Sequence, residues 1–507
     1  GLVVAPGFID IHGHSDYLIL ADPFAENKLF QGITTEVAGN CGLSAVPLGK
    51  SWLADWWVDD IKLRFNVISW DEARKVAERH KISFNWRTVS EYLKRLEERG
   101  IAINYCQLIG HHSLRAAVTG NVLDPPSRSE LEDMKILLEQ SIKEGAFGLS
   151  CGFDIPQKVE IEEFIELARV VAKHNGLFSN HIRSYGDKLI ESIKEAVKIT
   201  EESGVRMIIS HLMATNESNW GKVNTALKII DEARARGMEI YFDVIPFLTG
   251  GGNYYSPNIV SFLPNDFLKG NINENIKLLK DLEIREKVKD MMKKGISNKW
   301  YKELWYPLKF PLWEDAIRII AYKPNKNYEG KKISEIARLE RKDPYDVILD
   351  LIIKDPSAKF VIVEQCEEDL CQLLSHPLAM IGSDGGILKA IKRLGIPHPR
   401  QYSSFPRVLR RYVREKKILR LEEAIRKMTS LPAQVLRLHN RGLIKVGMYA
   451  DITIFDPEKV TDKSNYMKYP KTFAEGIKYV LVNGAVALEN GTLTKVLAGK
   501  VIKKLGQ

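Results

Sequence analysis

The chain has 507 residues, of which 45% are hydrophobic and 27% are charged, and this is the composition of an ordinary globular protein. It excludes long disordered tracts, collagen and a coiled-coil rod. The sequence contains no uninterrupted apolar stretch of the ~18 residues that a membrane span needs, so no membrane partner is expected. Residues Gly1–Pro6 lack the basic and apolar regions of a signal peptide.

The charged residues and the cysteines narrow the class of protein further. There are 74 Lys plus Arg and 65 Asp plus Glu, which gives a net charge of +9. The basic residues are spread along the chain among acidic ones, so no nucleic-acid partner is expected. A mild attraction for anionic substrates is expected from the net positive charge. Five cysteines, an odd number without a CxxC pair, favour a reducing cytoplasmic location over a disulfide framework.

Short apolar runs alternate with amphipathic helical stretches, such as Val89–Arg99 and Ile161–His174, from the start to about residue 250. This alternation predicts parallel βαβ units whose strands are buried on both faces. One more run follows much later, and the total of eight predicts an α/β fold with a closed (β/α)8 TIM barrel. The eight expected strands are Gly7–His12, Thr34–Ala38, Ile103–Ile109, Phe147–Cys151, Leu177–His181, Val205–His211, Met238–Ile245 and Leu378–Ile381. The run Lys359–Val363 is a further candidate strand without an assigned place.

Two segments depart from the alternation of predicted strands and helices. Residues 253–335 contain Pro, Asn, Trp and Lys-rich helical stretches, and an insertion of this length in a barrel loop predicts a lid. Short runs with Asn-Gly turns after residue 441 predict a small β domain over 441–507. The catalytic barrel would then cover residues 1–440. The expected strands of the small domain are Asp451–Phe455, Tyr479–Val482, Ala485–Leu488 and Val496–Val501.

The strongest local signal is the sequence Ile9-Asp10-Ile11-His12-Gly13-His14-Ser15-Asp16. Side chains at positions i and i+2 of a strand point to the same side, so His12 and His14 present two imidazoles together. Gly13 between them lets another group approach closely. In a barrel, the carboxyl ends of the strands face the active site. Two histidines at this spacing fit a metal site or a pair of ordinary loop histidines about equally well.

Further metal-binding residue types lie at the ends of other expected strands. Cys41, His181, His211 and Asp384 each follow a different apolar run. Imidazole, thiolate and carboxylate are the ligands that zinc prefers. Taken singly, Cys41 could be a small buried hydrophobe and Asp384 a helix cap. Their convergence with the two histidines on one barrel rim is the stronger hypothesis.

Together these motifs resemble the amidohydrolase superfamily, and more narrowly its D-aminoacylase (N-acyl-D-amino-acid deacylase) branch. The similarity covers nearly the whole chain. It rests on Ala5–Asp16, Gly39-Asn40-Cys41-Gly42, Gly110–Arg115, Glu144–Ser150, Met380–Gly385, His398-Pro399-Arg400 with Phe405-Pro406-Arg407, and Ala450-Asp451-Ile452. The Gly-Asn-Cys-Gly turn is the more specific motif, because most relatives bridge their metals with a carboxylated lysine.

The resemblance implies a metal-dependent hydrolase barrel that carries a small β-sandwich. By this resemblance Cys41, His181 and His211 hold the tighter Zn²⁺ ion. The same comparison assigns His12 and His14 to a second, weaker site that Cys41 and Asp384 can reach.

Roles in the reaction also follow from the resemblance. Zinc lowers the pKa of bound water to about 7, and Asp384 would act as the general base that moves its proton to the leaving amine. Arg400 matches the His-Pro-Arg position and suits a substrate carboxylate. Arg183 and His111 are the further candidates for substrate contacts. The expected function is hydrolysis of the amide bond of N-acyl amino acids, in particular N-acyl-D-amino acids, with this small molecule as the partner.

Two departures from the family pattern concern the substrate. Where relatives usually have Ser-His-Leu-Lys, this chain ends the motif with Met213, and the loop 245–251 lacks the usual tyrosine. A cationic and a phenolic substrate contact are therefore expected to be absent. A third departure is the start at Gly1, where relatives place an N-terminal β segment that completes the small domain. The strands of 442–504 are therefore expected to expose an unpaired edge and an apolar face.

Two alternatives stay open at this point. One is hydrolysis of a cyclic amide, as in dihydroorotase- or hydantoinase-like relatives, although these mostly use the lysine bridge instead of the cysteine turn. The other is a catalytically silent metal-binding homologue, against which the complete set of candidate ligands argues.

Overall fold

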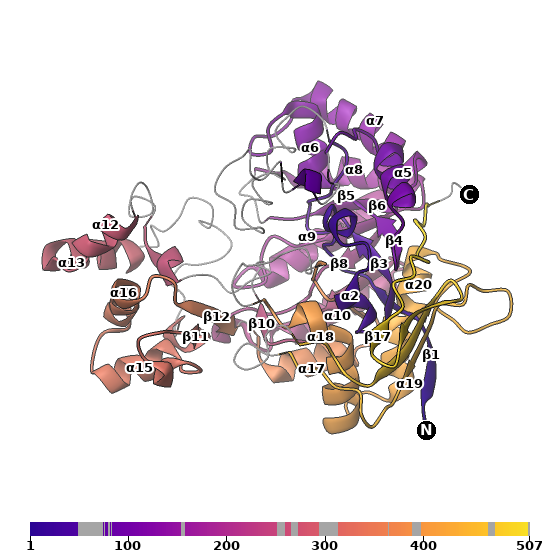
Figure 1. Cartoon of the computed structure of the whole chain (residues 1–507). Coiled ribbons are helices and arrows are strands. Elements are labelled where there is room, and N and C mark those ends of the chain that lie inside the picture. The colour runs from indigo at the N-terminus through magenta and orange to yellow at the C-terminus, as the bar shows by residue number, and fades with distance from the viewer. Residues whose placement is uncertain are drawn as a thin grey trace.

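The structure is a computed structural model of the chain, shown in Figure 1. It describes residues 1–48, 75, 77–79, 82, 84–153, 158–250, 259–264, 272–293, 313–363, 365–387, 397–464 and 472–504. A central barrel carries an additional unit on one side and a small antiparallel sheet on another (Figure 1). Among the described residues, no helix combines the length and apolarity that a bilayer crossing requires.

Eight parallel strands form the barrel, which confirms the predicted fold class. They are β2 (Phe8–Asp10), β3 (Ile33–Ala38), β4 (Asn104–Gln107) with its continuation β5 (Ile109–Gly110), β6 (Gly148–Cys151), β7 (Leu177–Asn180), β8 (Arg206–Ile209), β9 (Ile240–Val244) and β13 (Ala379–Ile381). The ring closes between β13 and β2, where Gly13 and Gly385 form a parallel bridge. At the same place the N–H of Asp384 donates to the carbonyl of His12 over 2.8 Å. The first and the last strand ends are thereby neighbours.

The barrel interior is filled by apolar side chains from successive strands, including Ile9, Val37, Ile208 and Met380. They pack with the apolar residues of α20 (Ser430–Leu436). The guanidinium of Arg206, the first residue of β8, donates to a carbonyl of α20. This helix therefore lies at the amino ends of the strands, and the opposite end, where the candidate ligands lie, is the polar one.

Amphipathic helices cover the outside of the barrel and bury their apolar faces against the strands. They are α5 (Val89–Arg99), α6 (His111–Thr119), α7 (Arg128–Lys143), α8 (Ile161–Lys173), α9 (Leu189–Ser203), α10 (Lys222–Ala235), α17 (Glu367–Ser375), α18 (Arg400–Arg407) and α19 (Leu421–Met428). Two of them begin with a capping box, in which Thr88 pairs with Glu91 and Ser127 with Glu130.

The additional unit has its own sheet and its own hydrophobic core. β10 (Thr249–Gly250), β12 (Lys359–Val363) and β11 (Ile317–Ala321) pair antiparallel in that order. The helices of the unit are α12 (Ile272–Leu278), α13 (Leu282–Lys293), α14 (Trp313–Ala316), α15 (Ile333–Glu340) and α16 (Pro344–Lys354). Its core runs from Ile259 to Ile362, so the unit extends beyond residue 335, the predicted end of the insertion. The further candidate strand at 359–363 is β12, the central strand of this unit's sheet. Of the predicted insertion, residues 253–258, 265–271 and 294–312 lie outside the described part.

The small sheet has the strand order β1 (Val3–Pro6), β14 (Ile452–Phe455), β15 (Ile477–Val482), β16 (Ala485–Glu489) and β17 (Thr492–Leu493). The expectation that β14 lacks a partner on its outer side was wrong, although β1 is then the outer strand and its Val4 is 56% exposed. β1 pairs along the whole of β14, and Phe455, Val480 and Leu488 are fully buried. The first residues of the chain therefore belong to this sheet.

The turns of the small sheet follow the sequence, but its last expected strand does not. Asn483-Gly484 and Asn490-Gly491 both adopt positive φ at the two positions, as tight hairpin turns require. The prediction of a strand at Val496–Val501 was wrong. This segment makes only single bridges, from Gly499 to Ile101 and from Val501 to Tyr105, and so attaches the chain end to the barrel.

Candidate metal centre

Six candidate ligands lie together at the carboxyl ends of the barrel strands. They form two groups that share Cys41, and within each group the possible ligand atoms all lie within 4.8 Å of one another. We call one group the Cys41 triad and the other, without the shared cysteine, the Asp384 triad. The Cys41 triad is Cys41, His181 and His211, and the Asp384 triad is His12, His14 and Asp384.

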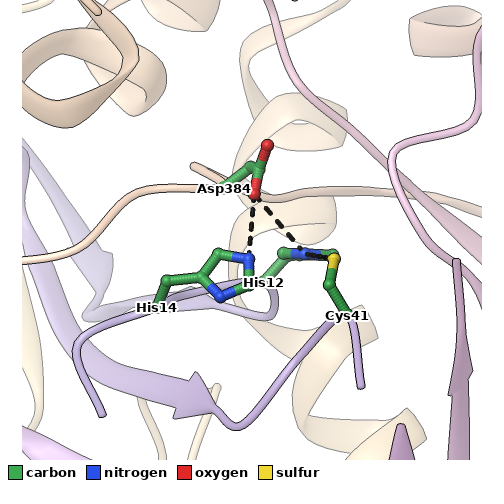
Figure 2. Close-up of side chains that lie close together, drawn as sticks. All are labelled: His12, His14, Cys41 and Asp384. Atoms are coloured by element: carbon green, nitrogen blue, oxygen red, sulfur yellow. Dashed lines mark hydrogen bonds and ion pairs between the residues drawn. The ribbon is translucent and has the colours of Figure 1, made fainter. Parts of the chain in front are cut away.

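In the Asp384 triad the carboxylate faces both histidines, as Figure 2 shows. Its Oδ1 lies 3.0 Å from Nε2 of His14 and 3.7 Å from Nε2 of His12. The rings of His12 and His14 are 5.3 Å apart between centroids. The motif at the end of β2 therefore presents both imidazoles to one carboxylate that follows β13.

The thiol of Cys41 links the two triads. Its Sγ lies 3.4 Å from Nε2 of His12 and 3.5 Å from Nε2 of His211. The rings of His181 and His211 meet edge to face at 4.7 Å. The thiol is buried and has little contact with solvent. It lies between an imidazole that follows β2 and one that follows β8.

The backbone is strained at three of these six positions. Cys41, His211 and Asp384 have φ values of +51°, +32° and +47°. Residues with a Cβ rarely adopt this conformation, and such strain persists where the surroundings enforce it, commonly at functional sites. The strain turns each side chain toward the others where its strand ends.

Gly13 permits the close approach that its place between the two histidines predicts. A Cβ there would lie 2.0 Å from Oε1 of Glu36, so only glycine fits. Glu36 in turn accepts a hydrogen bond from the hydroxyl of Ser15. A larger residue at position 13 would displace this buried carboxylate and the loop that carries His14.

Asp243 at the end of β9 contacts two of the candidate ligands and was not among the residues predicted from the sequence. Its Oδ2 lies 3.1 Å from Nδ1 of His12, and its Oδ1 accepts a hydrogen bond of 2.9 Å from the N–H of His211. A carboxylate on the far nitrogen of a histidine fixes the ring and makes it a better metal ligand. An acidic residue inside the apolar run of β9 was the signal that could have revealed it.

The pKa values of the two histidines on either side of Cys41 move in opposite directions. Burial lowers the pKa of His12, but the charge of Asp243 and its hydrogen bond outweigh that effect, so the pKa is raised. Burial, together with the charges of His181 and His12, holds the pKa of His211 well below its usual value. His211 is therefore neutral, which is the form that binds a metal.

The carboxylate of Asp384 is ionised because of a neighbouring arginine. Nη1 of Arg400 lies 2.7 Å from Oδ2 of Asp384. Burial raises the pKa of Asp384, but the charge of Arg400 and the hydrogen bond from His14 outweigh it and hold the pKa well below its usual value. The Nε of Arg400 is buried and has no hydrogen-bond partner among the described residues.

A second set of buried charges supports the loop that carries His14. Nζ of Lys28 lies 2.7 Å from Oδ2 of Asp10 and 3.2 Å from Oε1 of Glu36, and it also donates to the carbonyl of Gly385. Burial lowers the pKa of Lys28, but the two carboxylates outweigh this and raise it. The ammonium group therefore ties β2, β3 and the turn after β13 together directly beside the candidate ligands.

Arg183 and His111, the other predicted substrate contacts, do not join the cluster. The guanidinium of Arg183 lies 2.8 Å from Glu195 and stacks over the ring of Phe153. Nε2 of His111 lies 2.8 Å from Glu163. Both side chains are held by acidic partners on the helical layer, so their assignment to the substrate has no support from this geometry.

The donor set fits a zinc ion. Zinc binds sulfur at about 2.3 Å and nitrogen at about 2.0 Å, so tetrahedral ligand atoms lie roughly 3.3–3.8 Å apart. The separations of 3.4 and 3.5 Å around the Cys41 thiol fall in this range. A buried thiol between imidazoles, with a carboxylate beside it, is the chemistry of a zinc site and not of a magnesium or calcium site.

A closed (β/α)8 barrel with this donor set at its carboxyl rim is typical of metal-dependent hydrolases. The chain belongs to the amidohydrolase family, whose sequence model matches residues 1–295 and 327–488. It is 30% identical to D-aminoacylase of Alcaligenes xylosoxydans xylosoxydans over 506 residues, which are 99% of this chain and 88% of that protein.

Two solved structures agree with this assignment. N-acyl-D-glutamate deacylase from Bordetella bronchiseptica, complexed with zinc and a phosphonate mimic of the tetrahedral intermediate, is 27% identical with a TM-score of 0.70. The match covers 99% of this chain and 89% of that one. A D-aminoacylase with a binuclear metal centre is 28% identical with a TM-score of 0.71, over 99% and 90% of the two chains. The resemblance to the D-aminoacylase branch is confirmed, and the chain is a hydrolase of amide C–N bonds.

Proposed function

We propose that this hydrolase cleaves the amide bond of N-acyl amino acids, with N-acyl-D-amino acids as its substrates. The observation that carries the proposal is the convergence of the Cys41 triad and the Asp384 triad around one thiol. The near-full-length similarity to D-aminoacylase supports the choice of substrate. In this proposal the Cys41 triad holds one zinc ion tightly, and His12 and His14 provide a weaker second site with Cys41 and Asp384.

When bound, zinc would lower the pKa of water to about 7 and polarise the amide carbonyl. In this proposal Asp384 is the general base and then the general acid of the reaction. Its Oδ1, which faces the two histidines, accepts a proton from the attacking water and later delivers it to the leaving amine. Its low pKa keeps it ionised, and thus able to accept, near neutral pH.

Arg400 orients the substrate. Its Nη1 binds Asp384, while its buried Nε has no partner among the residues that the structure describes. A buried donor without a partner is costly, and a substrate carboxylate would satisfy it with a charge-assisted hydrogen bond. Arg400 would then hold the amino-acid carboxylate next to the general base. This places the scissile amide beside the candidate metal ligands.

The test is hydrolysis of a panel of N-acetyl-D- and N-acetyl-L-amino acids by the zinc-loaded protein and by the protein after chelation. We expect turnover of the D substrates, loss of turnover on chelation and recovery on addition of zinc. Hydrolysis that does not respond to chelation would contradict the mechanism. Inactivity toward the panel together with turnover of a cyclic ureide would instead support the cyclic amide hydrolase.

A further inference from the structure

The additional unit is tied to the barrel at one closely bonded place. The chain enters the unit through β10 and leaves it through β12, and these strands pair at Thr249 and Val363 (Figure 1). Nε2 of Gln365, which follows β12, donates to the carbonyl of Phe247 over 2.7 Å. The N–H of Gln365 donates to the carbonyl of Leu248. We call these five residues the junction, because they hold the entry and the exit of the unit together.

The imidazole of His398 lies between the junction and Arg400. Its Nε2 donates to the carbonyl of Thr249 over 2.9 Å, and its Nδ1 accepts a hydrogen bond of 3.0 Å from the N–H of Arg400. The rings of His398 and Phe247 meet edge to face at 5.5 Å between centroids. His398 is buried, so both hydrogen bonds are shielded from water. One side chain therefore connects the additional unit to the main chain of Arg400.

A neutral imidazole suits this connection because it carries one donor and one acceptor. Burial and the charge of Arg400 hold the pKa of His398 well below its usual value, so the ring is neutral near neutral pH. The two hydrogen bonds require the tautomer with its hydrogen on Nε2. The connection therefore has a defined direction, from the Arg400 N–H through the ring to the Thr249 carbonyl.

The position of Arg400 depends on bonds from two sides. Arg400 is the first residue of α18, and its Nη1 lies 2.7 Å from Oδ2 of Asp384. On the barrel side, Oε1 of the next residue, Gln401, accepts a hydrogen bond of 2.8 Å from the N–H of Gly386. On the other side, His398 brings in the additional unit. A shift of either side would redirect the guanidinium that faces the proposed general base.

We propose that His398 is a positioning residue that makes carboxylate binding by Arg400 depend on the additional unit. With the junction in place, His398 holds the N–H of Arg400 and aims the guanidinium at both Asp384 and the substrate carboxylate. When this connection is cut, Arg400 keeps its charge but loses its fixed direction, so it holds the carboxylate less tightly. The inference rests on the proposed function, in which Arg400 binds that carboxylate.

The experiment compares N-acetyl-D-alanine with N-acetyl-D-alaninamide, which lacks the carboxylate that Arg400 would bind. Values of kcat and KM are measured on the zinc-loaded protein, together with affinity by calorimetry. We expect the unmodified protein to prefer the acid in both readouts. A positioning role acts on the acid alone, whereas a general loss of structure lowers the turnover of both compounds.

Two substitutions separate the two hydrogen bonds of His398. His398→Asn keeps an acceptor near Nδ1 but does not reach Thr249, and His398→Gln keeps a donor near Nε2 but no acceptor for Arg400. Because the connection needs both bonds, each change should reduce the preference for the acid by about tenfold, through KM and not kcat. His174→Asn, whose ring binds Glu139 on the outer helices, is the matched control and should leave the preference unchanged.

Gln365→Leu tests the connection from the side of the unit. It removes the hydrogen bond to Phe247 that closes the junction. By itself it should reduce the preference for the acid by about threefold, again through KM. In the His398→Asn background it should cause no further reduction, because the connection is already cut.

Each outcome bears on one proposal or on both. An unchanged preference in either His398 variant, or an equal loss for the acid and the amide, would overturn the positioning role. Independent effects of Gln365→Leu and His398→Asn would also overturn it. Turnover of both compounds without any preference for the acid would overturn it while the proposed function stands.

Calorimetry separates the remaining cases. Tighter binding of the acid that the His398 variants lose, without turnover of either compound, would support the positioning role and contradict the proposed function. Binding of neither compound by the zinc-loaded protein would overturn both.

Discussion

The Asp384 triad and the Cys41 triad are held in place by different forces. Charges and hydrogen bonds hold the Asp384 triad, in which Asp243 fixes His12 and Arg400 pairs with Asp384. Packing holds much of the Cys41 triad, because the ring of Tyr185 lies against both His181 and His211. The Nδ1 of His211 is buried without a hydrogen-bond partner among the described residues.

This difference predicts the order in which ions bind. The carboxylate of Asp384 is already neutralised by Arg400, so an ion that binds there must compete with an existing ion pair. The neutral imidazole of His211, whose Nδ1 has no hydrogen-bond partner among the described residues, is not engaged in such an ion pair there. We therefore expect the first ion at the Cys41 triad, and a second, weaker one at the Asp384 triad.

The largest effect is expected for Asp384→Asn. The amide keeps the size of the side chain but cannot accept the proton, so kcat should fall by about 10² to 10⁴. Because Asp384 is not part of the Cys41 triad, one zinc ion per chain should remain by elemental analysis. Asp133→Asn, on the exposed face of α7, is the matched control. An Asp384→Asn protein of ordinary activity would exclude this residue as the base.

Cys41→Ala should remove the tightly bound ion and roughly a hundred-fold or more of the activity, because the shared thiol is lost. Metal content after dialysis and kcat/KM are the measurements. Cys371→Ala, at a half-buried cysteine on α17, should leave both unchanged. If Cys41→Ala retained one equivalent of zinc with wild-type affinity, the shared role of the thiol would be wrong.

Asp243→Asn should affect one triad more than the other. The amide oxygen still accepts the N–H of His211, but the charge on the far side of His12 is gone. We expect the affinity for the second ion to fall by about tenfold, in the range measured for such partners, while the first ion stays bound. Titration with zinc tests this, and an equal loss at both sites would contradict the distinction between the triads.

Acid should act on the two triads in sequence. The raised pKa of His12 means that it binds a proton above pH 6.5, whereas His211 binds one only well below that value. As the pH of the metal-free protein falls, NMR of the histidine ring nitrogens should show His12 titrating first. In Asp243→Asn the titration of His12 should move to lower pH, and an unchanged titration would show that this carboxylate does not control it.

The barrel and the six candidate ligands were accessible from the sequence for one physical reason. Parallel strands end at the same rim, so polar residues such as Cys41 and His181 that follow apolar runs must meet there. The hairpin turns at Asn483 and Asn490 could also be predicted from the local sequence. Each turn needs two successive residues with positive φ, and the Asn-Gly pair is the residue pair that adopts this conformation most readily.

What the sequence did not reveal depends on contacts between distant segments. Asp243 lies 231 residues from His12, and nothing local marks it as the partner of that ring. The run 359–363 has the same β-branched character whether it joins the barrel or another sheet, and only its pairing with β10 and β11 decides. Arg183 and His111 were predicted to contact the substrate because the sequence does not show their acidic partners. These partners, Glu195 on α9 and Glu163 on α8, lie in other segments of the chain.

X-ray absorption at the zinc edge, on protein loaded with one equivalent of zinc, tests the central claim most directly. A sulfur neighbour at about 2.3 Å with nitrogen neighbours at about 2.0–2.1 Å is the predicted result, and in Cys41→Ser the sulfur signal should disappear. A zinc shell made of nitrogen and oxygen alone in the unmodified protein would contradict the shared thiol, and with it the arrangement of both triads.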